Sequence, residues 1–262
     1  MFILKRYYNF YKQNGLIKSL NKIILTPLRK LNKKRYEKKK REIFTKKTPK
    51  ERFELIYKSN FWLSEESVSG LGSESINTEN IRKKITNIIN ELKIEKILDA
   101  PCGDFNWIRS ILNNKLKYIG ADIVKNLIDK NNENHKGENI NFITLDITKD
   151  KLPDSDLMIC RDCLIHLSYK SIHSFFQNFG KSNIKYILLT SYKIKANDKE
   201  IYNKDIPDGE FREIDLSRSP FNLPNPLQQI LDKDIQGKES AFNCYLNLYS
   251  KNQIIQTINK KI

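Results

Sequence analysis

Four aspartates stand at or just past the ends of four successive apolar segments: Asp99, Asp122, Asp146 and Asp162. Carboxylates accept hydrogen bonds from ligand hydroxyl and amine groups, and they can take a proton during a reaction. His166 follows Asp162 by four residues, a spacing that puts both side chains on one face of a helical turn. An imidazole with an ordinary pKa of about 6.5 is suited to accept a proton at neutral pH. Asp162 and His166 are therefore the candidate catalytic residues, and His166 is the favoured base.

The loop after Asp99 has features of a site for a nucleotide-like ligand. Gly103 lets a ligand approach the backbone closely, and the predicted helix after the loop begins with free N–H groups. Asp122 follows Asp99 by 23 residues, close to the distance at which a carboxylate binds ribose hydroxyls in nucleotide sites. The loop and the second aspartate therefore predict one shared ligand.

The elements that position these residues alternate between buried strands and amphipathic helices. Right-handed crossovers are nearly obligatory, so this order predicts an α/β fold with a parallel sheet wrapped by helices. Ligands bind beyond the carboxyl ends of the strands in such sheets. The predicted strands are 94–99, 117–122, 141–145, 156–160 and 186–191, with an edge strand at 242–249; the predicted helices are 81–92, 107–112, 127–131 and 168–179, the last N-capped by Ser168.

The order of these strand ends over residues 95–191 resembles that of the class I S-adenosylmethionine-dependent methyltransferases. The resemblance implies a Rossmann-like, doubly wound, mostly parallel seven-stranded sheet, with S-adenosyl-L-methionine as the cofactor. Pro101 and Phe105 stand where the common family loop has glycines. In the family, the first loop holds the methionine moiety, the second acid binds the ribose, and residues after the third strand hold the adenine. Carried over by position, the cofactor-binding residues are Asp99, Cys102 and Gly103, then Asp122 with Ile123, and then Asp146 with Ile147.

Arg161 joins this cofactor-binding set because a guanidinium can pair with a ligand carboxylate or phosphate. An ion pair in the neighbourhood of Asp162 is the alternative interpretation. Cys160 and Cys163 have CxxC spacing, but zinc would need two more ligands nearby, so we expect no metal. Four scattered cysteines are too few for a disulfide framework, which favours a reducing, cytoplasmic location.

A closer resemblance is to a bacterial methyltransferase subfamily often associated with surface-polysaccharide gene clusters. It implies methyl transfer to a small-molecule or glycan acceptor, with a sugar hydroxyl favoured. Separately, the small residues of Ser67–Ser73 allow this segment to fold over a cofactor, with Trp62 as an apolar anchor; a plain loop is the alternative. The resemblance is carried by Glu66–Ser73, Asp99–Trp107, Cys160–His166, and Pro220 with Phe221.

The positive charge of the chain is concentrated at one end. Residues 1–52 hold 18 Lys and Arg against 3 Asp and Glu, whereas the remaining 210 residues hold 29 against 28. Apolar residues at helical spacing over 16–31 predict a basic amphipathic helix, which can pack on its own domain, lie on an anionic membrane surface or bind another partner. The sequence shows neither a signal peptide nor a transmembrane segment, so we expect a cytoplasmic protein, with peripheral binding at the inner membrane surface as an option.

We therefore expect a basic helical arm (1–52) and a methyltransferase domain (53–262). A Pro-rich segment, 193–240, is expected to form a substrate-binding cap before the last strand, where Asn203, Asp205 and Arg212 offer groups for a hydroxylated or anionic acceptor. The basic arm makes an RNA methyltransferase the alternative, but the balanced charge of the domain argues against a nucleic acid partner. A catalytically inactive scaffold at the membrane is a third hypothesis, against which the acids at the strand ends argue.

Overall fold

The computed structural model describes residues 34–194, 203–232 and 242–259. By its internal contacts the chain divides into two units, residues 1–47 and 48–262. In the first unit, residues 34–44 are helical. The predicted amphipathic helix over 16–31 lies outside the described residues. The second unit contains the sheet and the candidate site.

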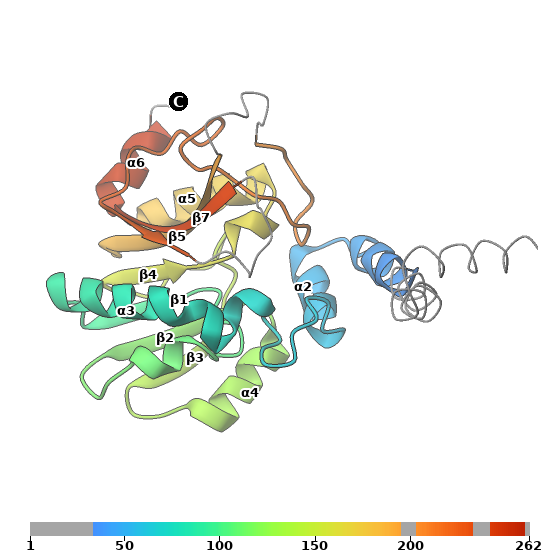
Figure 1. Cartoon of the computed structure of the whole chain (residues 1–262), viewed down its shortest axis with the longest axis horizontal. Coiled ribbons are helices and arrows are strands. Elements are labelled where there is room, and N and C mark those ends of the chain that lie inside the picture. Colours follow the sequence, from blue (N-terminus) through green and yellow to red (C-terminus); the bar gives the residue numbers. More distant parts are fainter. Residues whose placement is uncertain (1–33, 195–202, 233–241, 260–262) are drawn as a thin grey trace, which may run out of the picture. The chain divides into compact units, whose positions relative to one another are not determined.

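The second unit is built on a seven-stranded sheet with the strand order β3-β2-β1-β4-β5-β7-β6 within the described residues (Figure 1). The first five strands are parallel, and β7 is antiparallel to both of its neighbours. The predicted mostly parallel, Rossmann-like sheet is confirmed. The strands are β1 (Lys96–Asp99), β2 (Lys117–Asp122), β3 (Ile140–Thr144), β4 (Leu157–Cys160), β5 (Tyr186–Ile194), β6 (Gln228–Leu231) and β7 (Phe242–Ser250).

Helices cover both faces of this sheet because its central strands are apolar on both sides. Along β1, Ile97 packs in a core with α3 (Ser75–Glu91), and the next residue, Leu98, packs in a second core with α5 (Tyr169–Lys181). The other helices are α4 (Lys125–His135), which follows β2, and α6 (Lys251–Asn259), which packs beside α5. The doubly wound arrangement places the carboxyl ends of β1, β2 and β4 at one edge.

Two predicted elements differ from the structure. The strand predicted at the sheet edge, β7, lies inside the sheet because β6 pairs with its outer side. β6 has only four residues and begins with two glutamines, so it gives little strand signal. The helix predicted over 107–112 is a short 3-10 turn, Ile108–Ile111. It ends at an extended Leu112, and a segment this short cannot offset the cost of nucleating an α-helix.

The segment predicted as a cap has more structure than its polar, Pro-rich composition indicates. Besides β6, it contributes Ile214, Leu216, Phe221 and Leu223 to the core on the α5 side. Its described part is therefore anchored in the domain.

A helix that the sequence analysis missed, α2 (Pro49–Lys58), opens the second unit. Thr48 accepts a hydrogen bond from the Glu51 backbone, and the Glu51 carboxylate accepts one from the Thr48 backbone. Pro49 occupies the first helical position, where its lack of an N–H has no cost. This capping box is visible in the sequence and is a specific signal for a helix start.

The N-cap of α5 gives a first prediction. The Ser168 hydroxyl accepts a hydrogen bond from the Ser171 backbone N–H at 3.2 Å, as predicted from the sequence. Ser168→Ala should lower the free energy of unfolding by about 1 kcal/mol, because one N–H of the first helical turn loses its acceptor. Urea unfolding measures this loss. Ser174→Ala, within the same helix, is the control and should change stability by less than about 0.5 kcal/mol; equal effects would contradict the capping role.

Candidate active site

The carboxyl ends of β1, β2 and β4 open into a cleft with about 1220 Å³ of empty space, part of which is open to solvent. It lies where the strand order reverses between β1 and β4, the usual ligand position in open α/β sheets. Of the ten predicted site residues, nine line this cleft: Cys102, Gly103, Asp122, Ile123, Asp146, Ile147, Arg161, Asp162 and His166.

The tenth, Asp99, lies beneath the cleft. Its side chain is 1% exposed, and Oδ2 accepts a hydrogen bond from the Tyr118 hydroxyl at 2.8 Å. Burial raises the pKa of Asp99 to about 7, although the bond from Tyr118 and the positive charge of Arg161 act in the opposite direction. Asp99 therefore does not line the cleft, and its side chain joins the end of β1 to Tyr118 of the neighbouring strand β2.

The loop after β1 is held by the predicted serine-rich segment. The Asp104 carboxylate accepts hydrogen bonds from the Ser67 hydroxyl and the Val68 backbone N–H, both at 2.9 Å. Gly103 adopts a left-handed φ of 55°, and a Cβ there would lie 2.0 Å from the Ser69 hydroxyl oxygen. A larger residue at 103 would therefore displace the serine segment. Val68 and Ser69 also line the cleft, as expected of a segment that folds over a ligand.

Both carboxylate oxygens of Asp122 are held by backbone hydrogen bonds at the cleft. Its Oδ1 accepts from the Val124 backbone N–H at 3.0 Å and its Oδ2 from the Gly103 backbone N–H at 3.3 Å. Burial raises the pKa of Asp122 to about 6, while these backbone hydrogen bonds act in the opposite direction. Each carboxylate oxygen has a second lone pair, so the side chain can accept two further hydrogen bonds from a ligand.

Apolar side chains flank this acid, and Asp146 stands beyond them. Ile123, directly after β2, and Ile147, three residues past β3, line the cleft together with Asp122. Asp146 accepts hydrogen bonds from the Thr148 backbone N–H at 3.0 Å and from the Thr148 hydroxyl at 2.6 Å. This part of the cleft can hold a flat apolar ring with polar groups at its edge.

His166 has a defined tautomer in the structure. Its Nδ1 lies 2.9 Å from the backbone carbonyl oxygen of Glu210, and because a carbonyl only accepts, Nδ1 carries the proton. Burial lowers the pKa of His166, despite the opposing effects of the Glu210 carbonyl and Asp162. The neutral ring, whose centroid lies 5.2 Å from that of Trp62, therefore keeps an Nε2 lone pair that can accept a proton.

Asp162 and His166 would share one face if the segment between them were helical, but Asp162 lies outside the helical turn. It has a left-handed φ of 51°, and the chain becomes a 3-10 turn only at Leu164–His166. Its backbone N–H donates to the Thr190 hydroxyl at 2.8 Å, and that hydroxyl lies 3.2 Å from Oδ1. Both Asp162 and His166 nevertheless reach the same cleft.

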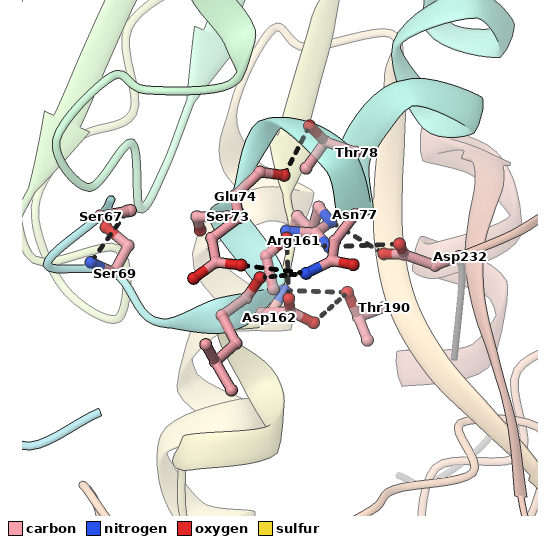
Figure 2. A network of polar contacts seen from close by, with 12 residues as sticks. Ser67, Ser69, Ser73, Glu74, Asn77, Thr78, Arg161, Asp162, Thr190 and Asp232 are labelled. Atoms are coloured by element: carbon pink, nitrogen blue, oxygen red, sulfur yellow. Dashed lines mark hydrogen bonds and ion pairs between the residues drawn. The ribbon is translucent and has the colours of Figure 1, made fainter. Parts of the chain in front are cut away.

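Arg161 joins three segments of the chain (Figure 2). Its Nε and Nη2 donate to the two carboxylate oxygens of Asp232, at 2.8 and 3.2 Å. Nη2 also donates to the backbone carbonyl of Gly72 at 3.0 Å, and Nη1 pairs with Asp162 at 3.2 Å. The predicted ion pair near Asp162 is present, and it leaves Arg161 at the wall of the cleft.

The same contacts bear on a cluster with the donor set of a metal site. Asp162, Asp232 and Cys244 bring ligand atoms within 4.8 Å of one another. Both carboxylates are already paired with Arg161, whose guanidinium supplies the positive charge that a cation would bring. The four cysteines are free thiols.

The side of the cleft formed by α2 was not predicted. Phe53 and Tyr57 of this helix line the cleft together with Trp62, the expected apolar anchor. Arg52 donates to the Asp208 backbone carbonyl at 3.0 Å, which fixes the helix against the segment that also holds His166. The capping box could have revealed the helix, but no local signal places it over the cleft.

Comparisons with known proteins agree with this geometry. Residues 97–182 match a family model described as a methyltransferase domain. Comparison with curated protein sequences gives no match.

Among solved structures, human N-acetylserotonin methyltransferase in complex with S-adenosylmethionine superposes with a TM-score of 0.51, at 14% identity, over 75% of this chain and 58% of that enzyme. Magnesium protoporphyrin IX methyltransferase from Synechocystis PCC 6803, with bound S-adenosylhomocysteine, gives a TM-score of 0.49 at 11% identity, over 74% of this chain and 92% of that one. The first likeness shows that the part of the chain it covers has the class I methyltransferase fold, and the match of residues 97–182 to the family model supports the same class.

No helix of the described residues is both long and apolar enough to cross a membrane.

The Arg161 contacts give a second prediction. Asp232→Asn removes the more deeply buried of the two charge partners of Arg161, a guanidinium that is 6% exposed, and should lower the free energy of unfolding by about 3 kcal/mol or more. Asp162 is 32% exposed, so Asp162→Asn should cost about 1 kcal/mol or less. Urea unfolding of both variants tests this ranking, and equal losses would contradict it.

The tautomer of His166 gives a third prediction. In nitrogen–proton correlation spectra of the imidazole rings, the His166 signal should show a proton on Nδ1 at pH 7. Its titration midpoint should lie below the ordinary value of about 6.5, because the ring is buried. His166→Gln assigns the signal. A ring protonated on Nε2, or a midpoint above about 7, would contradict the role of the Glu210 carbonyl.

Proposed function

We propose that this protein is an S-adenosylmethionine-dependent methyltransferase that transfers a methyl group to an oxygen of a small-molecule or glycan acceptor. The observation that carries the proposal is the placement of Asp122 and His166 in one cleft. Asp122 can bind ribose hydroxyls, and His166 can accept the proton of a reacting hydroxyl.

The residues of the cleft fit the proposed cofactor. Asp122 keeps two lone pairs for the ribose, and Ile123 and Ile147 are apolar surfaces suited to an adenine ring. The backbone at Cys102 and Gly103 is open to the methionine moiety because residue 103 has no side chain. When bound, the cofactor supplies an electrophilic methyl group on its sulfonium.

The chain's own contribution to the reaction is to position the acceptor and to remove its proton. His166 Nε2 is the proposed base, because the Glu210 carbonyl keeps the proton on Nδ1. Asp162 is the alternative base, but its Oδ2 is engaged in the ion pair with Arg161 at 3.2 Å. Phe53, Tyr57 and Trp62 exclude water from the side of the cleft formed by α2.

A sugar hydroxyl, in bacterial surface-polysaccharide biosynthesis, is the acceptor we favour. The support is the resemblance carried by three segments, each of which contributes residues to the wall of the cleft: Glu66–Ser73, Asp99–Trp107 and Cys160–His166. The nearly balanced net charge of residues 53–262 counts against an RNA acceptor. Contact of the basic arm with an anionic membrane surface is part of the same proposal and rests on the sequence pattern.

Binding of S-adenosylhomocysteine tests the proposal and gives a fourth prediction. Asp122→Ala should weaken binding by about 1.5 to 3 kcal/mol, because charge-assisted hydrogen bonds to the ribose are lost. The free protein protonates Asp122 below a pKa of about 6, so wild-type affinity should be constant above that pH and fall below it, by at most about tenfold per pH unit. Calorimetry at pH 5, 6, 7 and 8 measures both effects.

Asp122→Asn separates charge from shape in this experiment. It should bind weakly at every pH and lack the decline below pH 6 that we expect of the wild type. Asp129→Asn, an exposed carboxylate on α4, is the control and should behave as the wild type. A folded wild-type protein that does not bind S-adenosylhomocysteine would overturn the proposed function.

A further inference from the structure

A second guanidinium, Arg212, is buried in the segment that holds His166. The residue is 8% exposed. Its Nη1 donates to the backbone carbonyl of Ile165 at 3.3 Å, but Nε and Nη2 have no hydrogen-bond partner in the structure. A charged donor that is buried without an acceptor costs free energy, so its retention calls for a ligand.

The two unpartnered nitrogens, Nε and Nη2, form the edge of a guanidinium that can bind two oxygen atoms of one ligand at once. Nε–H and one N–H of Nη2 lie along the same edge of the planar guanidinium and point in parallel, so they match the two oxygens of a carboxylate or phosphate. Arg212 lies over the ring of Tyr169, 5.5 Å from its centroid. The Tyr169 hydroxyl is likewise buried and unpartnered. Two neighbouring side chains thus share unused donors.

Two carboxylates close to Arg212, those of Asp205 and Asp208, form hydrogen bonds with other groups instead. Asp208 accepts from the Ser168 backbone N–H at 2.6 Å and from the Ser171 hydroxyl at 2.9 Å. Asp205 accepts from the Tyr169 backbone N–H at 2.7 Å. Both therefore cap the start of α5, and neither forms an ion pair with Arg212 within the part of the chain that the structure describes.

The position of Arg212 ties it to the proposed base. The Gly209 backbone N–H donates to the His166 carbonyl at 2.7 Å, and the Arg212 backbone N–H donates to the Ile165 carbonyl at 3.0 Å. Between these two bonds, the Glu210 carbonyl accepts from the His166 ring. One stretch of backbone, residues 209–212, thus fixes both the imidazole and the guanidinium.

We infer that Arg212, with the Tyr169 hydroxyl, binds an anionic group of the methyl acceptor, a carboxylate or a phosphate, on the segment that also holds His166. The acceptor class is thereby narrowed to acidic or phosphorylated sugars. This inference rests on the proposed function and adds the charge of the substrate to it.

The test uses the full-length protein saturated with S-adenosylhomocysteine. Three probes are titrated calorimetrically: D-glucuronate, glucose 6-phosphate and glucose, the last as the uncharged control. At least one acidic sugar should bind about tenfold or more tightly than glucose, as expected for a charge-assisted pair of hydrogen bonds. Preference for glucuronate identifies a carboxylate, and preference for glucose 6-phosphate a phosphate.

Variants assign this preference to Arg212. Arg212→Gln should abolish it, and Arg212→Lys should restore part of it, because an ammonium keeps the charge without the paired donors. Tyr169→Phe should weaken acidic-sugar binding less than Arg212→Gln does. Lys204→Gln removes the same charge from an exposed position of the same segment and should leave the preference unchanged.

Affinity for S-adenosylhomocysteine, measured on each variant, separates the two proposals. Intact cofactor binding with no preference for acidic sugars, or with a preference that survives in Arg212→Gln, overturns the inference about Arg212 and leaves the methyltransferase proposal standing. Failure of the wild-type protein to bind S-adenosylhomocysteine would overturn the methyltransferase proposal itself.

Discussion

The buried guanidinium of Arg161 is the constraint on which the site depends. It follows β4 directly, and its donors reach Asp232 just past β6 and the Gly72 carbonyl in the serine-rich segment. A charge in that place must be paired, since leaving it uncompensated costs several kcal/mol. The edge of the sheet, the strand end that carries the candidate base and the segment over the cofactor loop are therefore fixed together.

Burial also sets the electrostatics of the floor of the cleft. Asp99 and Asp122 stand at the ends of neighbouring strands, and desolvation raises the pKa of each. A ligand that brings hydrogen-bond donors or positive charge to a buried carboxyl group stabilises its ionised form, so such a group binds such ligands well. S-adenosylmethionine, if it binds in this cleft, would bring such positive charge on its sulfonium and amino groups. The electrostatics and the proposed cofactor are thus mutually consistent.

The sequence predicted the parts of this arrangement whose signals are local. Apolar runs ending in aspartates located the strand ends, and the Ser168 cap located the start of α5. The pairing of Arg161 with Asp232 spans 71 residues and depends on β6, a strand too short and polar to recognise. The partner of the His166 ring is a backbone carbonyl, which every residue has, so no residue type could mark Glu210 in advance.

The hydrogen bonds of residues 209–212 to Ile165 and His166 decide which nitrogen of the His166 ring carries the proton. An imidazole in water exchanges its proton freely between two nitrogens, and only contact with the Glu210 carbonyl selects one of them here. The ring of the proposed base therefore has one defined tautomer only while that stretch of backbone keeps its contact with His166. A substitution that displaces residues 209–212 would therefore return the ring to a mixture of tautomers, even though His166 itself is unchanged.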